Sequence, residues 1–423
     1  EIYTLSLHDA LPILVDTSDT RSLVFDLVRA AGQVSRAGLA ERTGLTAATI
    51  STTVRQLLAD GLVAESGRAP STGGKPRTFV SVVPEARFAV GIQVGHSGAV
   101  LVVTDLTGSV LAMTRRQTGA DPGTAEFVDR LTEEFDEILL AAGLSRSDVV
   151  GAGVGLSGLI DRRQISGRQQ DYRGHRPAGL RGDLERALGV PVVVDNDATA
   201  AALGEWWVSS AGQTEDAVVV YLGAGIGAGL LMEGQVVQGG SGNAGELGHV
   251  CVDVHGPRCV CGAQGCVEAV AGPWAVVEAA ISRPALARAA GLGAEVGTHG
   301  SVEADFAAVA RAARRGLPEA ERLLTESARV LAVAVRSVVN VVDADAVILT
   351  GPSIAVAAPI YLPVIASEIR TMSYARTIHE VAVRLSPNGS TAAAIGAAAL
   401  ALYEDIRCQP RSEERRVGKE CRS

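Results

Sequence analysis

Aromatic side chains are scarce in this chain: Phe, Trp and Tyr make up 4% of its 423 residues, whereas 47% are apolar. Its cores must therefore be built mainly from Ala, Val and Leu. Long hydrophobic runs are missing too. None reaches the roughly 18 residues that cross a bilayer, and the N-terminus lacks the basic region and apolar block of a signal peptide. The composition predicts a globular, cytoplasmic protein, long enough for two or three domains.

Basic residues do not predominate either, because the formal net charge is −9. This excludes a protein that coats nucleic acid along its whole surface, but it does not exclude a local DNA-binding surface. Within residues 14–84, eight Lys and Arg side chains outnumber six Asp and Glu side chains. The acidity therefore lies in the remainder of the chain.

Cysteine is rare, with six residues in the chain. Cys251, Cys408 and Cys421 are scattered without a pairing pattern, which fits a reducing compartment. The other three lie close to a histidine in the segment GELGHVCVDVHGPRCVCGAQGCVE, residues 245–268. Four ligand-type residues in so short a window predict a metal site.

The residues of this predicted metal site are His249, Cys259, Cys261 and Cys266. Imidazole and thiolates suit zinc, and four such ligands complete a tetrahedron with no position left for a reacting water. We therefore expect a structural zinc ion. Gly262 and Gly265 would let the loop fold back without Cβ crowding. The alternative is that these are ordinary buried or free thiols.

The two ends of the chain resemble translated sequencing-adapter DNA. They are the opening EIYTLSLHDALPI, residues 1–13, and the closing RSEERRVGKECRS, residues 411–423. The closing segment has no apolar periodicity that could dock it on a core. We expect both to be non-native additions outside the fold. The alternative is a natural flexible arm and a basic tail.

Residues 20–60 predict three helices. The first carries apolar residues at the i, i+1, i+4, i+5 rhythm of one helical face and ends near Gly32. Ser35 is the expected N-cap of a short second helix, Gly44 makes a tight turn, and Thr46 is the expected N-cap of the third helix. Helix, short helix, glycine turn and helix form the helix-turn-helix pattern, whose last helix lies in the major groove of DNA.

Two alternating segments, LVAES and TFVSVV, follow the third helix and are joined by the glycine-rich GRAPSTGGKPR. They predict a wing and complete a winged helix-turn-helix domain over residues 20–84. Small hydroxyl residues let a helix approach base edges, and cations suit phosphates. The predicted DNA contacts are Ser35, Arg36, Thr46, Ala47, Thr49, Ser51, Thr52, Arg55, Lys75 and Arg77. The alternative is a helix-turn-helix module that docks a protein.

From Arg87 onward strands alternate with helices. FAVGIQVG, AVLVVTDLTG and SVLAMTRRQT predict a meander, whereas VVGAGVGLSGLID and PVVVDNDATAAALGEWW predict buried strands that enter a glycine-rich loop and an alanine-rich helix. The alternation recurs with AVVVYLGAGIGAGLLM, the helix 319–342, AVILTG and the helix TAAAIGAAALALY. These patterns predict an α/β protein with two similar lobes and a cleft between them.

Several ordered segments, VDNDATAAALGE, VYLGAGIGAGLLMEGQVVQGGSGNAGELGHV and CVCGAQGCVE, together with the winged module, resemble the ROK family, named for repressors, open reading frames and kinases. The resemblance covers residues 20–405. It implies an actin-like fold of the sugar-kinase type over 87–405, with a zinc loop beside a sugar pocket and a homodimer or homotetramer as the assembly. We expect lobe one at 87–205 plus 388–405 and lobe two at 206–387.

The family's sugar-binding positions, carried over to this chain, fall on Gly158, Asn196, Asp197, Glu246, His249 and Glu268. Carboxylates and an amide suit vicinal hydroxyls, because such buried groups would stay unpaired beside an analogue that lacks a hydroxyl. His249 would bind zinc through one ring nitrogen and face a sugar hydroxyl with the other. The alternative for Asp197 and Glu268 is a structural role.

In a sugar kinase of this family Asp197 would be the base that takes the proton from the sugar hydroxyl. The family's first hairpin normally carries an aspartate followed by Gly-Gly-Thr, whereas this chain has QVGHS at residues 93–97. Pro352 stands where a later glycine run would donate backbone amides. The glycines at 223, 225, 227 and 229 resemble a phosphate loop, but such glycines also mark tight strand turns.

The sequence therefore predicts a protein without enzymatic activity: a sugar-responsive transcriptional regulator, most simply a repressor of carbohydrate-use genes. Its expected partners are operator DNA and a sugar or sugar phosphate, with zinc as cofactor and no membrane. The alternative is a glucokinase-like, ATP-dependent sugar kinase.

Overall fold

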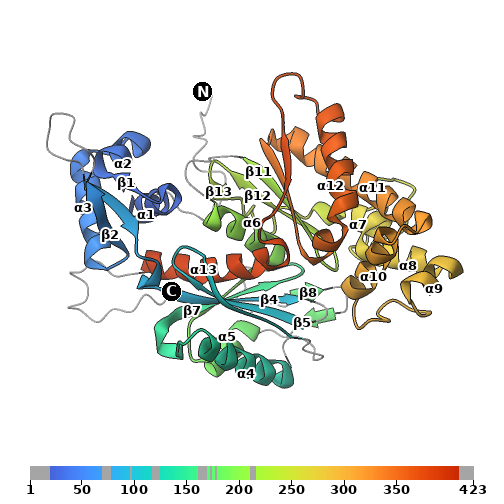
Figure 1. The fold of residues 1–423 in the computed structure, drawn as a ribbon, viewed down its shortest axis with the longest axis horizontal. Helices are drawn as coiled ribbons and strands as arrows, with labels where there is room; N and C mark the ends of the chain where they lie inside the picture. The colour runs from blue at the N-terminus through green and yellow to red at the C-terminus, as the bar shows by residue number, and fades with distance from the viewer. Residues whose placement is uncertain are drawn as a thin grey trace, which may run out of the picture.

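The computed structural model describes residues 20–68, 78–95, 98–116, 124–160, 169–171, 174–176, 179–209 and 216–408. Within these ranges the chain forms a small N-terminal module and two lobes, each built on a five-stranded sheet (Figure 1). Helix α13 (Ala392–Cys408) lies between the two sheets and packs along α6 (Asp197–Val208). The predicted two-lobed α/β fold is confirmed. The segments predicted to be non-native, 1–13 and 411–423, lie outside the described residues.

The N-terminal module has the predicted order of helices and wing strands. Its elements are α1 (Thr20–Ala31), β1 (Val34–Ser35), α2 (Arg36–Thr43), α3 (Ala47–Ala59), β2 (Val63–Arg68) and β3 (Thr78–Val82). Ser35 Oγ accepts from the Gly38 amide at 3.1 Å, and Thr46 Oγ1 accepts from the Thr49 amide at 3.2 Å. Both predicted N-caps are therefore present. The two-residue strand β1, which pairs with β3, is too short to leave a periodic pattern and was missed.

Lobe one contains a sheet of strand order β10-β7-β4-β5-β6. Its strands are β4 (Phe88–Gly95), β5 (Gly98–Asp105), β6 (Val110–Arg116), β7 (Val149–Leu156) and β10 (Val192–Asn196). The first three form the predicted antiparallel meander, and β7 and β10 add parallel strands. Helices α4 (Ala125–Ala141) and α5 (Leu180–Leu188) join this lobe's core, and β8 (Gln169–Asp171) and β9 (Gly174–Arg176) form a separate ribbon.

The scarcity of aromatic residues has a counterpart in the packing of α13 on this sheet. A Cβ placed on Gly91 of β4 would lie 1.8 Å from the carbonyl oxygen of Ala394, and one on Gly153 of β7 would lie 1.7 Å from that of Ala397. The helix and strand backbones therefore touch, with glycine on the strands and alanine on the helix. A larger side chain at either glycine would push α13 off the sheet.

Lobe two contains a sheet of strand order β13-β12-β11-β14-β15. Its strands are β11 (Ala217–Leu222), β12 (Ile226–Met232), β13 (Gln235–Val236), β14 (Ala346–Thr350) and β15 (Ala382–Leu385). Its helices are α7 (Val267–Ala271), α8 (Pro273–Ile281), α9 (Pro284–Ala290), α10 (Val302–Arg314), α11 (Pro318–Val342) and α12 (Pro352–Met372). These helices form the larger of the two lobe cores with one face of the sheet.

One expectation for lobe two is wrong in detail. The segment AVVVYLGAGIGAGLLM does not continue the alternation of strands and helices, because β11 and β12 form an antiparallel hairpin. Gly223 donates its amide to the carbonyl oxygen of Gly225 at 3.1 Å within the turn. So short a connection joins antiparallel strands, whereas parallel strands need a crossover of a dozen or more residues. The crossover connections come later in the chain. They lead to β14, which pairs in parallel with β11, and to β15, which pairs in parallel with β14.

Helix α12 is the one described helix that is long and apolar enough to cross a membrane. It packs against α11 and β15, and Ile354, Tyr361 and Ile365 are buried in the core of lobe two. A core helix has the same composition as a membrane span, so α12 is weak evidence for one.

The winged module docks where α6 and α13 end (Figure 1). Phe25 of α1 and Tyr403 of α13 flank the buried indole of Trp207, with ring centroids 6.5 and 6.4 Å from it. The guanidinium carbon of Arg29 lies 4.4 Å from the ring centroid of Trp206 and 4.6 Å from that of Trp207. Arg29 also donates to the carbonyl oxygens of both tryptophans. Aromatic rings and one cation therefore join α1 to the C-terminal end of α6.

A buried carboxylate accompanies that cation. Asp26 Oδ1 lies 3.7 Å from Arg29 Nε, one turn away on α1. Burial raises the pKa of Asp26 to about 7, although the guanidinium opposes this shift. The same burial lowers the pKa of Arg29. The junction thus holds two neighbouring ionisable groups that have been removed from water.

Candidate ligand cleft, metal cluster and DNA-facing helix

A cleft with an empty volume of about 740 Å³, its open mouth included, lies between the lobes. All six predicted sugar positions line it: Gly158, Asn196, Asp197, Glu246, His249 and Glu268. The first three lie at or just after the ends of β7 and β10 of lobe one, and the other three come from lobe two. The fold therefore brings together residues that are far apart in the chain.

Asn196 and Asp197 lie at the junction of β10 and α6. Asn196 Oδ1 accepts from the amides of Ala198 at 2.8 Å and Thr199 at 3.2 Å, and its Nδ2 donates to the carbonyl oxygen of Gly158 at 3.1 Å. Asn196 therefore caps α6 and fixes the loop that carries Gly158. Asp197 begins the helix and is 9% exposed at the cleft. Its carboxylate is the group of this pair that a ligand would meet.

Glu246 precedes a short 3-10 helix, Leu247–His249, and His249 ends it. Glu246 Oε2 lies 3.9 Å from His249 Nε2. Burial raises the pKa of Glu246, and the neighbouring imidazole opposes that shift. The Nε2 side of His249 thus faces a carboxylate of the cleft.

Glu268 lies in the first turn of α7 and is 8% exposed. Its Oε2 accepts from the Ile226 amide at 2.7 Å, whereas its Oε1 is buried without a hydrogen-bond partner among the described residues. Burial raises the pKa of Glu268 to about 7, and the Ile226 hydrogen bond opposes the shift. One half of the carboxylate therefore positions β12, and the other half is available to a ligand.

The four predicted metal ligands form one cluster. One ring nitrogen of His249 and the sulfur atoms of Cys259, Cys261 and Cys266 all lie within 4.8 Å of one another. Cys259 Sγ is 3.5 Å from His249 Nδ1, and Cys261 Sγ is 3.6 Å from Cys266 Sγ. Two thiolates on one tetrahedral zinc ion, with Zn–S bonds of about 2.3 Å, lie roughly 3.8 Å apart. The donor set and its spacing fit zinc.

The backbone of the cysteine loop explains its glycines. Gly262 and Gly265 take positive φ angles of 91° and 69°, as the fold-back of the loop predicts. A Cβ placed on Gly265 would lie 1.6 Å from the carbonyl oxygen of Asp253. The loop can therefore close around the cluster only with glycine at position 265.

Sequence reasoning did not predict Gln93, Tyr221 and Glu303, which line the cleft, or Asn243, which precedes the lining residue Ala244. Asn243 joins the lobes, because its Oδ1 accepts from the Ile160 amide and its Nδ2 donates to the Ile160 carbonyl oxygen, both at 2.8 Å. Gln93, Tyr221 and Glu303 line the cleft together with Glu246 and Glu268. Asn243 lies within the segment that carries the family resemblance and was open to recognition there. Gln93 lies in the hairpin segment QVGHS and Tyr221 in the segment VYLGAGIGAGLLM, so both were open to recognition as well, whereas Glu303 belongs to no motif of the sequence.

Two of the glycines that resemble a phosphate loop, Gly227 and Gly229, have a packing role. A Cβ on Gly227 would lie 2.8 Å from Ala198 Cβ, and one on Gly229 would lie 2.3 Å from Ala202 Cβ. These two glycines let β12 pack closely on α6. Pro352 lines the cleft and begins α12 without an amide hydrogen. Residues His96 and Ser97 of the altered first hairpin lie outside the described residues.

On the winged module the outer face of α3 is largely free. Ala47, Thr52 and Arg55 are exposed, and Thr49 and Ser51 are half-buried. Thr46 Oγ1 caps α3 and lies 2.9 Å from Thr49 Oγ1. The predicted wing contacts Lys75 and Arg77 lie outside the described residues.

The other two predicted DNA contacts already have partners within the protein. Ser35 is buried, and its hydroxyl caps α2. Arg36 Nη2 lies 3.2 Å from Glu65 Oε1, with both side chains about half exposed. An ion pair so exposed is weak, so Arg36 can leave Glu65 for a phosphate at little cost. The Ser35 side chain has no such freedom.

A winged helix-turn-helix joined to a two-lobed actin-like body, with a Cys3His cluster beside the cleft, defines the class of this protein. The chain belongs to the ROK family, whose pattern matches residues 89–404. It is 31% identical over 248 residues to a xylose repressor of Bacillus subtilis strain 168. The aligned residues make up 58% of this chain and 63% of that protein. It is 30% identical over 261 residues to the DNA-binding transcriptional dual regulator NagC of Escherichia coli K12, 60% and 62% of the two chains.

Two solved structures extend the comparison. A ROK family transcriptional regulator described as a homologue of the E. coli MLC protein superposes with a TM-score of 0.67 at 25% identity, over 91% of this chain and 96% of that one. A ROK family glucokinase from Streptomyces griseus, solved with glucose and AMPPNP, gives a TM-score of 0.57 at 26% identity, over 74% and 98%. Regulators and kinases thus share this body.

Proposed function

We propose that this protein is a sugar-responsive transcriptional regulator, a cytoplasmic repressor of carbohydrate-use genes that acts as a homodimer or homotetramer. The observation that carries the proposal is the joining of an exposed recognition-type helix, α3, to a body whose interlobe cleft is lined by fixed polar groups. The names of the similar repressors support the same function. Operator DNA and a sugar are the two partners.

In this proposal α3 enters the major groove with Ala47, Thr52 and Arg55 toward the bases and phosphates. The caps formed by Ser35 and Thr46 orient α2 and α3, so their contribution to DNA binding is largely one of position. Arg36, Lys75 and Arg77 contact phosphates, which adds affinity and salt dependence but little sequence preference.

The metal cluster is proposed to hold a structural zinc ion through His249, Cys259, Cys261 and Cys266. With four protein ligands, the ion has no open position for catalysis. When bound, the ion holds the cysteine loop and fixes the imidazole, so that His249 Nε2 faces the cleft beside Glu246. The ring can then hydrogen-bond a sugar hydroxyl.

Helix α6 is proposed to connect the two binding functions. Its first residue, Asp197, faces the cleft, and its last turn contacts Arg29 and Phe25 of the winged module through Trp206 and Trp207. A sugar that prefers one position of α6 would thereby shift the position of α1. It would change DNA affinity only by its differential affinity for the two positions.

The test is a DNA-shift titration with the gene's own upstream region, with and without a panel of sugars. Arg55→Ala should weaken operator binding by about tenfold or more, because a lost arginine contact to a base costs about 1–3 kcal/mol. Arg322→Ala on α11 removes the same charge from an exposed position of lobe two and serves as the control. Equal effects of both variants, or no effect of any sugar, would contradict the proposal.

A sugar kinase is the second candidate, favoured by the match to the glucokinase and by Asp197 at the cleft. The lost acid at Gln93 and the missing amide of Pro352 argue against it. Incubation with ATP, magnesium and the sugar panel decides between the two, because a kinase releases ADP and the phosphorylated sugar. Turnover at a rate of about 1 per second or faster, a usual enzyme rate, would favour the kinase.

A further inference from the structure

The chain passes between the two lobes twice: it leaves lobe one after α6 and returns through the segment 386–391, between β15 and α13. The first part of this return segment is bonded to lobe two. The Ser386 amide donates to the Leu349 carbonyl oxygen at 2.9 Å, and Thr350 Oγ1 donates to the Gly389 carbonyl oxygen at 2.8 Å. Both partners belong to β14, so the return segment is held to the sheet of lobe two as far as residue 389.

At the next residue the return segment is bonded to the other lobe. Arg115 Nη2, on β6 of lobe one, donates to Ser390 Oγ at 2.7 Å. Gly389, the last residue bonded to lobe two, has a positive φ of 48°, and a Cβ placed on it would meet no atom of the described chain within 4 Å. A glycine in such space can change its backbone angles at little cost. A rotation of one lobe against the other would therefore be absorbed at residues 389 and 390.

One buried carboxylate joins the return segment to α6. Glu205, which is 6% exposed, accepts from the hydroxyl of Ser386 and, at 3.3 Å, from Asn388 Nδ2. The same Ser386 oxygen accepts from the backbone amides of Asn388 at 3.0 Å and Gly389 at 3.2 Å. Burial raises the pKa of Glu205, and the hydrogen bonds from Ser386 and Asn388 oppose that shift. Because a buried carboxylate is costly without its donors, we expect the end of α6 to move with the return segment.

Glu205 directly precedes the two residues that contact the winged module. The carbonyl oxygens of Trp206 and Trp207 accept from Arg29 of α1, whose guanidinium carbon lies within 4.6 Å of both ring centroids. The helix is continuous to Val208, so Glu205 and both tryptophans belong to one rigid turn of α6. A displacement of the Glu205 carboxylate therefore reaches α1 through these tryptophans.

We propose that Glu205 is a positioning residue of the sugar response, which makes the end of α6, and with it the winged module, follow the angle between the lobes. The inference rests on the proposed sugar-responsive function and names the residue that links the cleft to the DNA-binding module. A sugar that contacts both Asp197 of lobe one and Glu246 of lobe two would fix that angle. Glu205 itself does not line the cleft, so its loss should uncouple sugar binding from DNA binding and leave each of them intact.

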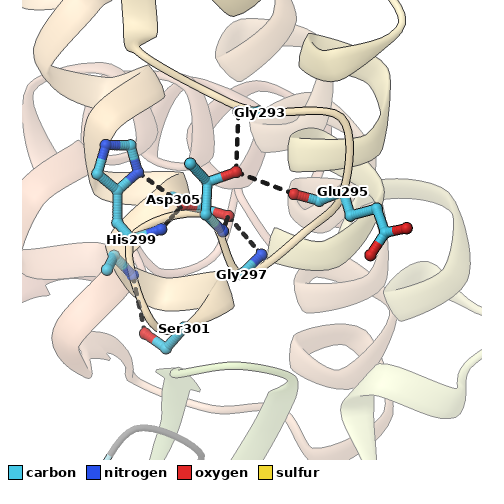
Figure 2. A network of polar contacts seen from close by, with 8 residues as sticks. Gly293, Glu295, Gly297, His299, Ser301 and Asp305 are labelled. Atoms are coloured by element: carbon cyan, nitrogen blue, oxygen red, sulfur yellow. Dashed lines mark hydrogen bonds and ion pairs between the residues drawn. The ribbon is translucent and has the colours of Figure 1, made fainter.

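A second buried carboxylate, Asp305 of α10, provides the matched control because its partners all lie in one lobe. Figure 2 shows it at the centre of the loop before α10, where it accepts from the backbone amides of Gly297, Thr298 and His299 and from His299 Nδ1 at distances of 2.6–3.0 Å. Burial works to raise the pKa of Asp305, but these hydrogen bonds outweigh it and lower the pKa. Asp305 and Glu205 thus hold loops in the same way, but only Glu205 holds a segment between the lobes.

The experiment measures operator affinity of the full chain with and without xylose, glucose, N-acetylglucosamine, glucose 6-phosphate and N-acetylglucosamine 6-phosphate, and the affinity for each sugar by calorimetry. Coupled sites usually change each other's affinity by about 5–150-fold, and Glu205→Ala should reduce the effect of the most active probe to about twofold or less while that probe still binds within about threefold of its parent affinity. Ser386→Ala, which removes the donor hydroxyl, should act in the same way.

Two further variants separate positioning from general destabilisation. Glu205→Gln keeps an accepting oxygen and should retain most of the sugar effect. Asp305→Asn should lower the Tm and leave the sugar effect as it is in the parent protein. A full sugar effect in both Glu205→Ala and Ser386→Ala would overturn the proposal, as would an equal loss of the effect in Asp305→Asn.

Hydrogen exchange of the protein without sugar or DNA distinguishes failure of this proposal from failure of the regulatory function. Glu205→Ala should speed exchange of the α1 amides and of the Asn388 and Gly389 amides by about fivefold or more, because these segments lose a shared anchor. Asp305→Asn should speed exchange at residues 297–299 and leave α1 unchanged. Unchanged exchange of α1 in Glu205→Ala would refute the positioning role even if a sugar regulates operator binding. Faster exchange of α1, with no operator response to any probe, would refute the regulatory function and keep the link between Glu205 and the winged module.

Discussion

The two ends of α6 place charged groups in opposite surroundings. At the C-terminal end, Asp26 and Arg29 are buried and Arg29 lies over the rings of Trp206 and Trp207, so water was removed from both groups when the chain folded. At the N-terminal end, Asp197 and Glu246 are largely buried as well, but they line an open cleft where a ligand can reach them. Substitutions at the first end should therefore change stability. Substitutions at the second end should change the ligand response and leave stability nearly as it was.

The largest expected effect is an exception to this comparison. The metal cluster lies beside the cleft, but a substitution in it should change stability. Cys261→Ser removes one zinc ligand, and binding energy for structural zinc, about 10–16 kcal/mol in small zinc-finger peptides, is also folding energy. Zinc content by atomic absorption should fall well below one per chain, and the Tm of lobe two should fall. Cys251→Ser, at an exposed thiol outside the cluster, should change neither. Full zinc and an unchanged Tm in Cys261→Ser would refute the zinc assignment.

Trp207→Ala tests the enclosed end. It removes the ring between Phe25 and Tyr403 and should cost about 3–5 kcal/mol of unfolding free energy, as large aromatic-to-alanine changes in a core do. It should also abolish the effect of sugar on operator binding, since the contact between α6 and α1 is lost. Trp274→Ala, at a ring that is 43% exposed, should cost much less. Urea unfolding of both variants measures the difference, and equal costs would count against the junction.

The buried pair sharpens the comparison through pH. The pKa of Asp26 is raised from 3.8 to about 7 in the folded protein, so the unfolded chain loses its proton first as pH rises. The resulting contribution to stability is complete below pH 4 and is lost as pH rises through about 7. Asp26→Asn cannot titrate and should flatten the decline of Tm between pH 5 and 8. Parallel Tm profiles for the variant and the parent protein would show that Asp26 does not titrate there.

The smallest effect on stability is expected at the open end. Glu246→Ala should change unfolding free energy by no more than about 0.5 kcal/mol, as substitutions at partly exposed positions usually do. Stabilisation by a saturating sugar, roughly 2.7 kcal/mol at 100 times its dissociation constant, should nevertheless disappear. Glu326→Ala, at an exposed carboxylate of α11, should keep it. Thermal shifts with and without sugar measure both quantities. A stabilisation by sugar that survives in Glu246→Ala would locate the ligand elsewhere.

Much of this molecule was predictable wherever the interacting residues are neighbours in the chain. The caps Ser35 and Thr46 and the turn at Gly44 depend on backbone groups two to four residues away, so their patterns were visible in the sequence. The metal cluster was visible for the same reason, since His249 and Cys266 bound one short loop. The predicted sugar positions came from the family resemblance, and the fold gathers all of them in one cleft.

By itself, then, the sequence determined the winged module, the two-lobed α/β body and the cysteine cluster. Only the tertiary structure decided that Gln93, Tyr221 and Glu303 line one cleft and that Arg29 reaches the end of α6. Each of these contacts joins elements distant in the chain, and no local periodicity or spacing records them. The identity of a side chain states which hydrogen bonds it can make. Whether it remains unpartnered at the wall of a cleft depends on which strands and helices pack around it.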